Sequence, residues 1–188
     1  MAYRTEETNV TLATARPSHQ GIASNAACLA ALAIAVIAAA TLAGAWFFQL
    51  VLDIRPCPLC LEQRYAYYLA LPLAAFVAFF AARGAPRQLL MAGFVILLVA
   101  ALANAWLGGY HAGVEWKFWP GPTDCSGPLV DFSKAGNLLE QLDKVKVIRC
   151  DEVQWRFLGL SLAGYNVLIS LAMAAVALLG FVRSAKRA

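Results

Sequence analysis

Four long stretches without a charged residue constrain this chain more than any other feature, and they cover 17–52, 65–82, 88–114 and 157–182. A helix needs about 20 mostly apolar residues to cross the roughly 30 Å hydrocarbon core of a membrane. The pattern predicts four membrane helices, near 24–50, 61–82, 88–110 and 157–182. The second stretch is short by this measure, so its helix takes in residues between Cys60 and Arg64, with the arginine reaching the membrane surface.

The composition excludes most other classes of protein. Of the 188 residues, 61% are hydrophobic and 14% are charged, whereas soluble domains are about 45–50% apolar and about 25% charged. A soluble enzyme, a disordered chain and a secreted disulfide-rich miniprotein are excluded, and the basic residues are too scattered for nucleic-acid binding. We predict an all-α integral membrane four-helix bundle over 24–182, with tails at 1–23 and 183–188 and external loops at 51–60 and 111–156.

Basic residues next to the spans predict the orientation of the bundle. With four spans, both tails and the loop between the second and third spans share one side. Arg83 and Arg87 flank that loop without an acidic residue, and Arg183, Lys186 and Arg187 directly follow the last span. Because Lys and Arg close to span ends favour the cytoplasmic side, we expect both termini in the cytoplasm and both long loops outside.

Four of the five cysteines fall on the predicted external side. Cys57 and Cys60 form a C-x-x-C motif, and Cys125 and Cys150 lie in the long loop. The external compartment is oxidising, and four cysteines allow three pairings. Proximity in the sequence favours Cys57–Cys60, which leaves Cys125–Cys150. Cys28 lies in an alanine-rich span, where a cysteine usually has only a packing role.

Three uses of these four thiols can be compared. A four-ligand zinc site commonly uses two closely spaced pairs, and only one pair here is close, so we expect no metal site. Two inert disulfides would fit a non-catalytic membrane protein, such as an assembly factor or scaffold. A C-x-x-C disulfide closes a very small loop and adds little stability. The motif is therefore better explained by two exchangeable disulfides.

Arg64 lies on the same predicted helical face as Cys60, one turn further on. Cys60 is near the N-terminus of the second helix, where the helix dipole favours a thiolate. A guanidinium at this distance adds to that stabilisation, or binds a polarised carbonyl oxygen of a ligand. The alternative is an arginine that only marks the membrane boundary.

Several further motifs accompany these cysteines in a fixed order, namely Phe48-Gln49, Pro56-Cys57-x-Leu59-Cys60, Arg64, Pro120-x-Pro122 and Trp155-x-Phe157-Leu158-Gly159-Leu160. From about Trp46 to the fourth span, the chain resembles the disulfide bond formation protein B (DsbB) family. Members of this family are thiol oxidases of the bacterial inner membrane, built as four-helix membrane bundles.

The resemblance implies a route for electrons. The long-loop pair would oxidise a periplasmic thioredoxin-like partner (DsbA-like), with Cys125 forming the mixed disulfide. Electrons would then pass to the Cys57–Cys60 pair and on to a membrane quinone, either ubiquinone or menaquinone. Cys60 would face the quinone and Arg64 would help to hold it.

His111 is the local candidate for a histidine that the family often carries before the first long-loop cysteine, close to the quinone. Its alternative role is that of an ordinary interfacial histidine. Other functions also stay open at this point, including a paralogue dedicated to one special substrate. A protein similar to vitamin K epoxide reductase is disfavoured, because in that group the C-x-x-C motif lies late in the chain.

Overall fold

The computed structural model describes residues 25–122 and 149–186. It contains four long helices, α1 (Ala26–Leu50), α2 (Pro58–Ala82), α3 (Arg87–Glu115) and α5 (Leu162–Ala185). Each is long and apolar enough to cross a membrane, by length and composition. Two short strands, β1 (Arg156–Phe157) and β2 (Leu160–Ser161), precede α5. The prediction of an all-α four-helix membrane bundle is confirmed.

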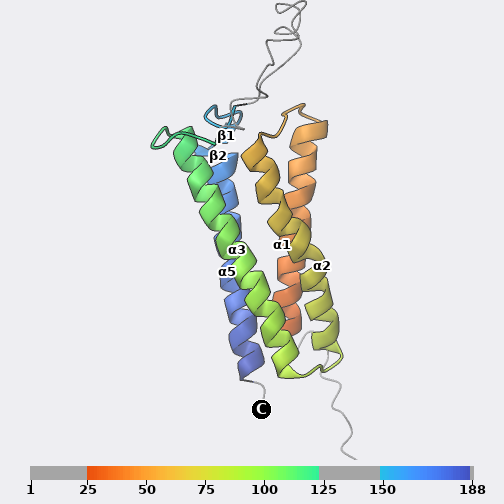
Figure 1. Ribbon diagram of the computed structural model, residues 1–188. Coiled ribbons are helices and arrows are strands. Elements are labelled where there is room, and N and C mark those ends of the chain that lie inside the picture. Colours follow the sequence, from red (N-terminus) through yellow and green to blue (C-terminus); the bar gives the residue numbers. More distant parts are fainter. Residues whose placement is uncertain (1–24, 123–148, 187–188) are drawn as a thin grey trace, which may run out of the picture.

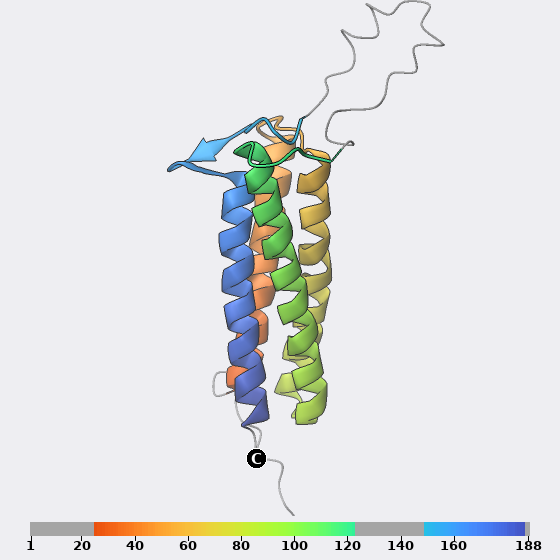
Figure 2. The same cartoon turned by 60° about the vertical axis from the view of Figure 1, so that its left-hand side comes forward.

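The helices alternate in direction and form a closed ring of neighbours, as Figures 1 and 2 show. Helix α1 packs on α2, α2 on α3, α3 on α5, and α5 on α1. The start of α1, the α2–α3 turn and the end of α5 lie at one end of the bundle (Figure 1). The chain before α2, the end of α3 and the two strands lie at the opposite end. Apart from Cys28, the cysteines among the described residues all lie at this second end.

Three helix boundaries differ from the predicted ones, each for a local reason. Helix α2 begins at Pro58 because Cys57 caps it and proline suits the first helical position. Helix α3 runs one turn further than expected, to Glu115. Helix α5 begins at Leu162 because the residues before it form a hairpin. The first cysteine loop therefore covers 51–57 in place of 51–60, and the connection between α3 and α5 covers 116–161 in place of 111–156.

The hairpin of β1 and β2 turns through two residues with positive φ, Leu158 at 48° and Gly159 at 83°. Positive φ at both central positions defines a type I′ turn, which fits the twist of paired strands. Ser161 ends the hairpin and caps α5, accepting a hydrogen bond from the Gly164 N–H at 3.2 Å. The hairpin therefore connects the chain after Cys150 firmly to the start of α5.

Small side chains fill the space between the helices, as is usual where membrane helices approach closely. The buried alanines of the core include Ala27, Ala31, Ala38, Ala70, Ala74, Ala81, Ala101, Ala174 and Ala177. Cys28 belongs to the same buried cluster, as predicted. Gly180 of α5 lets the ring of Phe94 approach so closely that an added Cβ would lie 2.3 Å from it.

A buried polar cluster joins three of the helices in the middle of the bundle. The Tyr67 hydroxyl donates to Asn166 Oδ1 at 2.5 Å, and Asn104 Nδ2 donates to Ser170 Oγ at 3.0 Å. These bonds link α2, α3 and α5 where lipid offers no alternative partner. They fix how the three helices are rotated against one another.

We expect the Gly180→Ala substitution to destabilise the bundle by about 1–3 kcal/mol, because the new methyl group overlaps the fully buried Phe94 ring. Unfolding of the detergent-solubilised protein measures the effect. Gly109→Ala in α3 is the matched control, since its Cβ meets nothing within 4 Å. Equal stability of the two variants would contradict the close α3–α5 packing.

Candidate active site

The C-x-x-C motif forms the start of α2. Cys57 is the N-cap residue, and its Sγ accepts a hydrogen bond from the Cys60 N–H at 3.3 Å. The two sulfur atoms lie 2.9 Å apart, which is longer than the roughly 2.05 Å of a disulfide. Both residues are free thiols here. The site is thus described in its dithiol form, without the predicted Cys57–Cys60 disulfide.

The two thiols are not equivalent. The Cys57 thiol donates to Cys60 Sγ, and this hydrogen bond together with burial raises the pKa of Cys57 above its usual value. Cys57 is only 2% exposed, whereas Cys60 is half-buried. Cys57 therefore keeps its proton, and Cys60 is the sulfur that is both reachable and supported by a hydrogen bond.

Arg64 is held by helix α1. Its Nη1 donates to Gln49 Oε1 at 2.7 Å and its Nη2 donates to the carbonyl oxygen of Ala45 at 3.3 Å. The guanidinium also lies 5.7 Å from the centre of the Trp46 ring, within cation–π range. These contacts hold the cation against the cavity wall, one turn from Cys60 as predicted.

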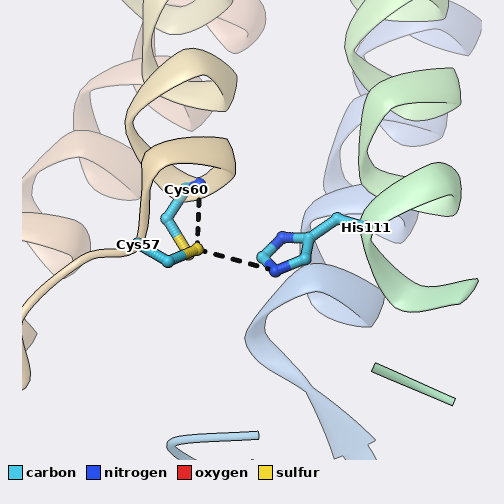
Figure 3. A group of neighbouring side chains, drawn as sticks. All are labelled: Cys57, Cys60 and His111. Carbon is cyan, nitrogen blue, oxygen red and sulfur yellow. Dashed lines mark hydrogen bonds between the residues drawn. The ribbon is translucent and has the colours of Figure 1, made fainter. Parts of the chain in front are cut away.

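His111 points from α3 directly at the C-x-x-C motif, as Figure 3 shows. Its Nε2 lies 3.6 Å from Cys57 Sγ, and its Nδ1 lies 2.9 Å from the side-chain amide nitrogen of Gln63. At 3% exposure, His111 is fully enclosed. The extra turn of α3 places it inside the bundle, so it is not an ordinary interfacial histidine.

Two residues of this site were not assigned a role from the sequence. Gln63 orients the His111 ring from α2. Glu115 lies one turn after His111, with Oε1 3.9 Å from His111 Nε2, and its Oε2 accepts a hydrogen bond from the Ser161 hydroxyl. The four-residue spacing from His111 to Glu115 is a signal that could have placed both on one helical face. Gln63 gives no comparable signal.

Cys150 belongs to the small buried cluster that includes the first cysteine of the C-x-x-C motif. It is 1% exposed and lies in one buried cluster with Cys57, Leu59 and Val114. Cys150 is itself disulfide-bonded. Cys125 lies outside the described residues, so the Cys125–Cys150 pairing stays a prediction. A cysteine of the long loop therefore lies in the same buried cluster as the Cys57 thiol.

A cavity of about 500 Å³ opens beside these residues. Its polar lining includes Cys57, Cys60, Arg64, His111 and Glu115. The lining is mainly apolar and comes largely from α1, α2 and α5, with walls that include Leu42, Phe48, Trp155, Phe157, Leu162 and Ile169. The Trp155 and Phe157 rings stack at 5.9 Å, and Phe48 meets Trp155 edge-on at 5.0 Å. Such an apolar, aromatic space with a few convergent polar groups is typical of a site for a small hydrophobic ligand.

The site combines a dithiol at a helix start with an arginine and a histidine, beside an apolar cavity in a membrane bundle. This combination places the protein in the class of membrane thiol oxidoreductases. The sequence model of the family described as "Disulfide bond formation protein DsbB" matches residues 27–180. The chain belongs to the DsbB family and is an oxidoreductase of disulfide bond formation.

Curated relatives agree over most of their length. "Disulfide bond formation protein B 1" of Pseudomonas fluorescens is 32% identical over 160 residues, which are 82% of this chain and 89% of the relative. "Disulfide bond formation protein B" of a Polaromonas species is 28% identical over 156 residues, covering 82% of this chain and 90% of that protein. "Disulfide bond formation protein B" of Aromatoleum aromaticum is 32% identical over 136 residues, covering 69% of this chain and 76% of that protein. These similarities do not favour a non-catalytic membrane protein or a specialised paralogue.

We expect Cys60 of the reduced protein to react faster than Cys57 with a small alkylating reagent. The thiolate is the nucleophile, and the raised pKa of Cys57 keeps that thiol protonated. Alkylation of Cys57 should stay slow at neutral pH and increase only above the ordinary cysteine range. Mass spectrometry of the two modified peptides measures both rates over a pH series. Equal rates at neutral pH would contradict the proton assignment.

Proposed function

We propose that this protein reoxidises a periplasmic dithiol protein of thioredoxin type (DsbA-like) and delivers the electrons to a membrane quinone. The observation that carries the proposal is the position of the C-x-x-C pair between two neighbours. Cys57 shares a buried cluster with Cys150 of the long loop, and both Cys57 and Cys60 line the apolar cavity with Arg64. The C-x-x-C pair thus lies between a cysteine of the second pair and the space for a lipid-soluble oxidant, and Cys60 is the more exposed of its two thiols.

Electrons enter through the long loop. A thiolate of the partner attacks the Cys125–Cys150 disulfide at Cys125, forms a mixed disulfide and releases the Cys150 thiolate. Cys150 attacks Cys57 Sγ, breaking the Cys57–Cys60 bond and releasing the Cys60 thiolate. The second thiol of the partner then releases Cys125, which re-forms its bond with Cys150 and leaves Cys57 and Cys60 reduced. Each exchange needs a thiolate directed at a disulfide sulfur, and the buried cluster that Cys57 and Cys150 share places the two residues in one region.

The cavity fits a quinone head group, whether of ubiquinone or of menaquinone. Its aromatic and aliphatic walls suit a flat ring, and Arg64, His111 and the two thiols line the same space. A quinone accepts two electrons and two protons when it is reduced to the quinol. Arg64 uses two of its five N–H donors on α1, so others remain for a carbonyl oxygen and its developing negative charge. His111 and Cys57 hold protons beside the same space.

This route requires the external end of the bundle to face the periplasm. Both tails, at 1–23 and 183–188, then lie in the cytoplasm, in agreement with the basic residues that flank them. The residues from 24 to 182 act as a single membrane domain of the bacterial inner membrane. In this orientation the site lies at the periplasmic surface, within reach of a soluble partner.

The proposal is tested with purified protein, a reduced thioredoxin-like dithiol protein and a soluble ubiquinone analogue. We expect quinone reduction by the unaltered protein, followed by absorbance, and only the background rate from Cys60→Ser. Cys28→Ser is the matched control, because Cys28 is buried in the core far along α1 from the site. A normal rate from Cys60→Ser would show that the electrons take another path.

Arg64→Ala should raise the apparent KM for quinone by about tenfold or more, because a charged hydrogen bond contributes about 1.5–3 kcal/mol. Arg83→Ala serves as the comparison, since Arg83 stacks on Phe79 at the opposite end of the bundle. Steady-state rates over a quinone concentration series give the apparent KM of each variant. An unchanged KM in Arg64→Ala would remove Arg64 from the quinone site.

A further inference from the structure

Three side chains at the start of α2 and the end of α3 form a group whose chemistry is not limited to thiol exchange. Cys57 Sγ, Cys60 Sγ and His111 Nε2 all lie within 4.8 Å of one another. Figure 3 shows the imidazole directed at the two sulfur atoms from the facing helix. Two thiols and one imidazole are the donors that zinc and related thiophilic cations prefer.

The distances are close to those of a tetrahedral zinc site. Bonds of about 2.3 Å to sulfur and about 2.05 Å to nitrogen place neighbouring sulfur and nitrogen ligands about 3.6 Å apart. Cys57 Sγ and His111 Nε2 are separated by 3.6 Å. The two sulfur atoms are 2.9 Å apart and would have to separate to about 3.8 Å, which a small side-chain rotation provides.

The imidazole is already oriented for this purpose. Metal-bound histidines usually donate their other ring N–H to a fixed acceptor. The Gln63 side-chain amide lies at Nδ1, with 2.9 Å between the nitrogen atoms. When that amide turns over, its oxygen accepts the Nδ1 proton and leaves Nε2 for a metal. Gln63 is 5% exposed and His111 is 3% exposed, so neither depends on solvent.

The charges also balance. Binding a divalent cation to the dithiol releases two thiol protons, and two thiolates with one dication give a neutral group. A neutral group is the species that a mainly apolar cavity tolerates best. Glu115 lies next to the imidazole, with Oε1 3.9 Å from Nε2, but it is not one of the three donors. A water molecule fills the fourth coordination position without adding charge.

We propose that the reduced protein binds one thiophilic divalent cation of the zinc class through Cys57, Cys60 and His111. The sequence disfavoured zinc because the four loop cysteines lack the spacing of two close pairs; the histidine of α3 takes the place of the second pair. The oxidised protein does not bind, since both sulfur atoms are then committed to the disulfide. The bound cation holds the thiols as thiolates and blocks their oxidation.

The test uses full-length protein in detergent carrying Cys125→Ser and Cys150→Ser, so that only the site thiols and Cys28 remain. After reduction and removal of the reductant without oxygen, Cd²⁺ is titrated, and its thiolate absorbance reports binding. We expect one cation per protein, none after the Cys57–Cys60 disulfide is formed, and Zn²⁺ in competition. His111→Ala should weaken binding by at least about tenfold. His19→Ala, which removes the other histidine of the chain, should leave binding unchanged.

Two results would overturn the site. One is equal affinity of the His111→Ala and His19→Ala proteins, and the other is equal Cd²⁺ binding before and after oxidation. Thermal unfolding of each variant shows that it is folded. Inhibition of quinone reduction by the bound cation rests on the proposed function and is measured separately. The protein with all its cysteines is assayed for quinone reduction with Zn²⁺ present, and again after a chelator has removed the Zn²⁺. Binding without a reversible loss of rate would overturn that consequence alone.

Discussion

The lack of hydrogen-bonding partners in the hydrocarbon core of a membrane determines where this protein can place chemistry. Within that core, backbone groups must be satisfied inside helices, so irregular turns, caps and reactive groups are pushed to helix ends. The site follows this rule closely. Cys57 caps α2, Glu115 is the last residue of α3 and Ser161 caps α5. Three helix ends therefore meet at the site, and each contributes a polar side chain that a helix interior would not accommodate without a partner.

The N-cap position of Cys57 gives the two sulfur atoms of the C-x-x-C motif different surroundings, although the cysteines are only three residues apart. Cys57 shares a buried cluster with Cys150, and its Sγ lies 3.6 Å from His111 Nε2. Cys60, one turn into the helix, borders the apolar cavity with Arg64. The cap geometry produces this difference, because it buries the first cysteine under the helix start and leaves the second on the helix flank. A C-x-x-C motif in the middle of a helix would not separate its thiols in this way.

Much of the fold could be predicted from the sequence, because charge-free stretches report membrane helices directly. Arg64 was also placed correctly relative to Cys60, since both lie on α2 and only the helical repeat was needed. The contact of His111 with Cys57 joins two helices, and its prediction requires the rotation of α3 against α2. That rotation depends on side-chain packing and on the buried cluster around Asn104 and Asn166. The start of α5 was missed because the type I′ turn at Leu158 carries a residue that seldom adopts positive φ.

The cavity lies along the seam between α1 and α5, which are the first and last helices of the chain. No loop joins these two helices, whereas every other neighbouring pair in the ring is joined in sequence. Their separation is therefore not limited by a short connection. Under the proposed function, a quinone with a long isoprenoid tail would keep that tail in the lipid while its head group reaches the thiols along this seam. That path would be separate from the aqueous face at which the proposed protein partner docks.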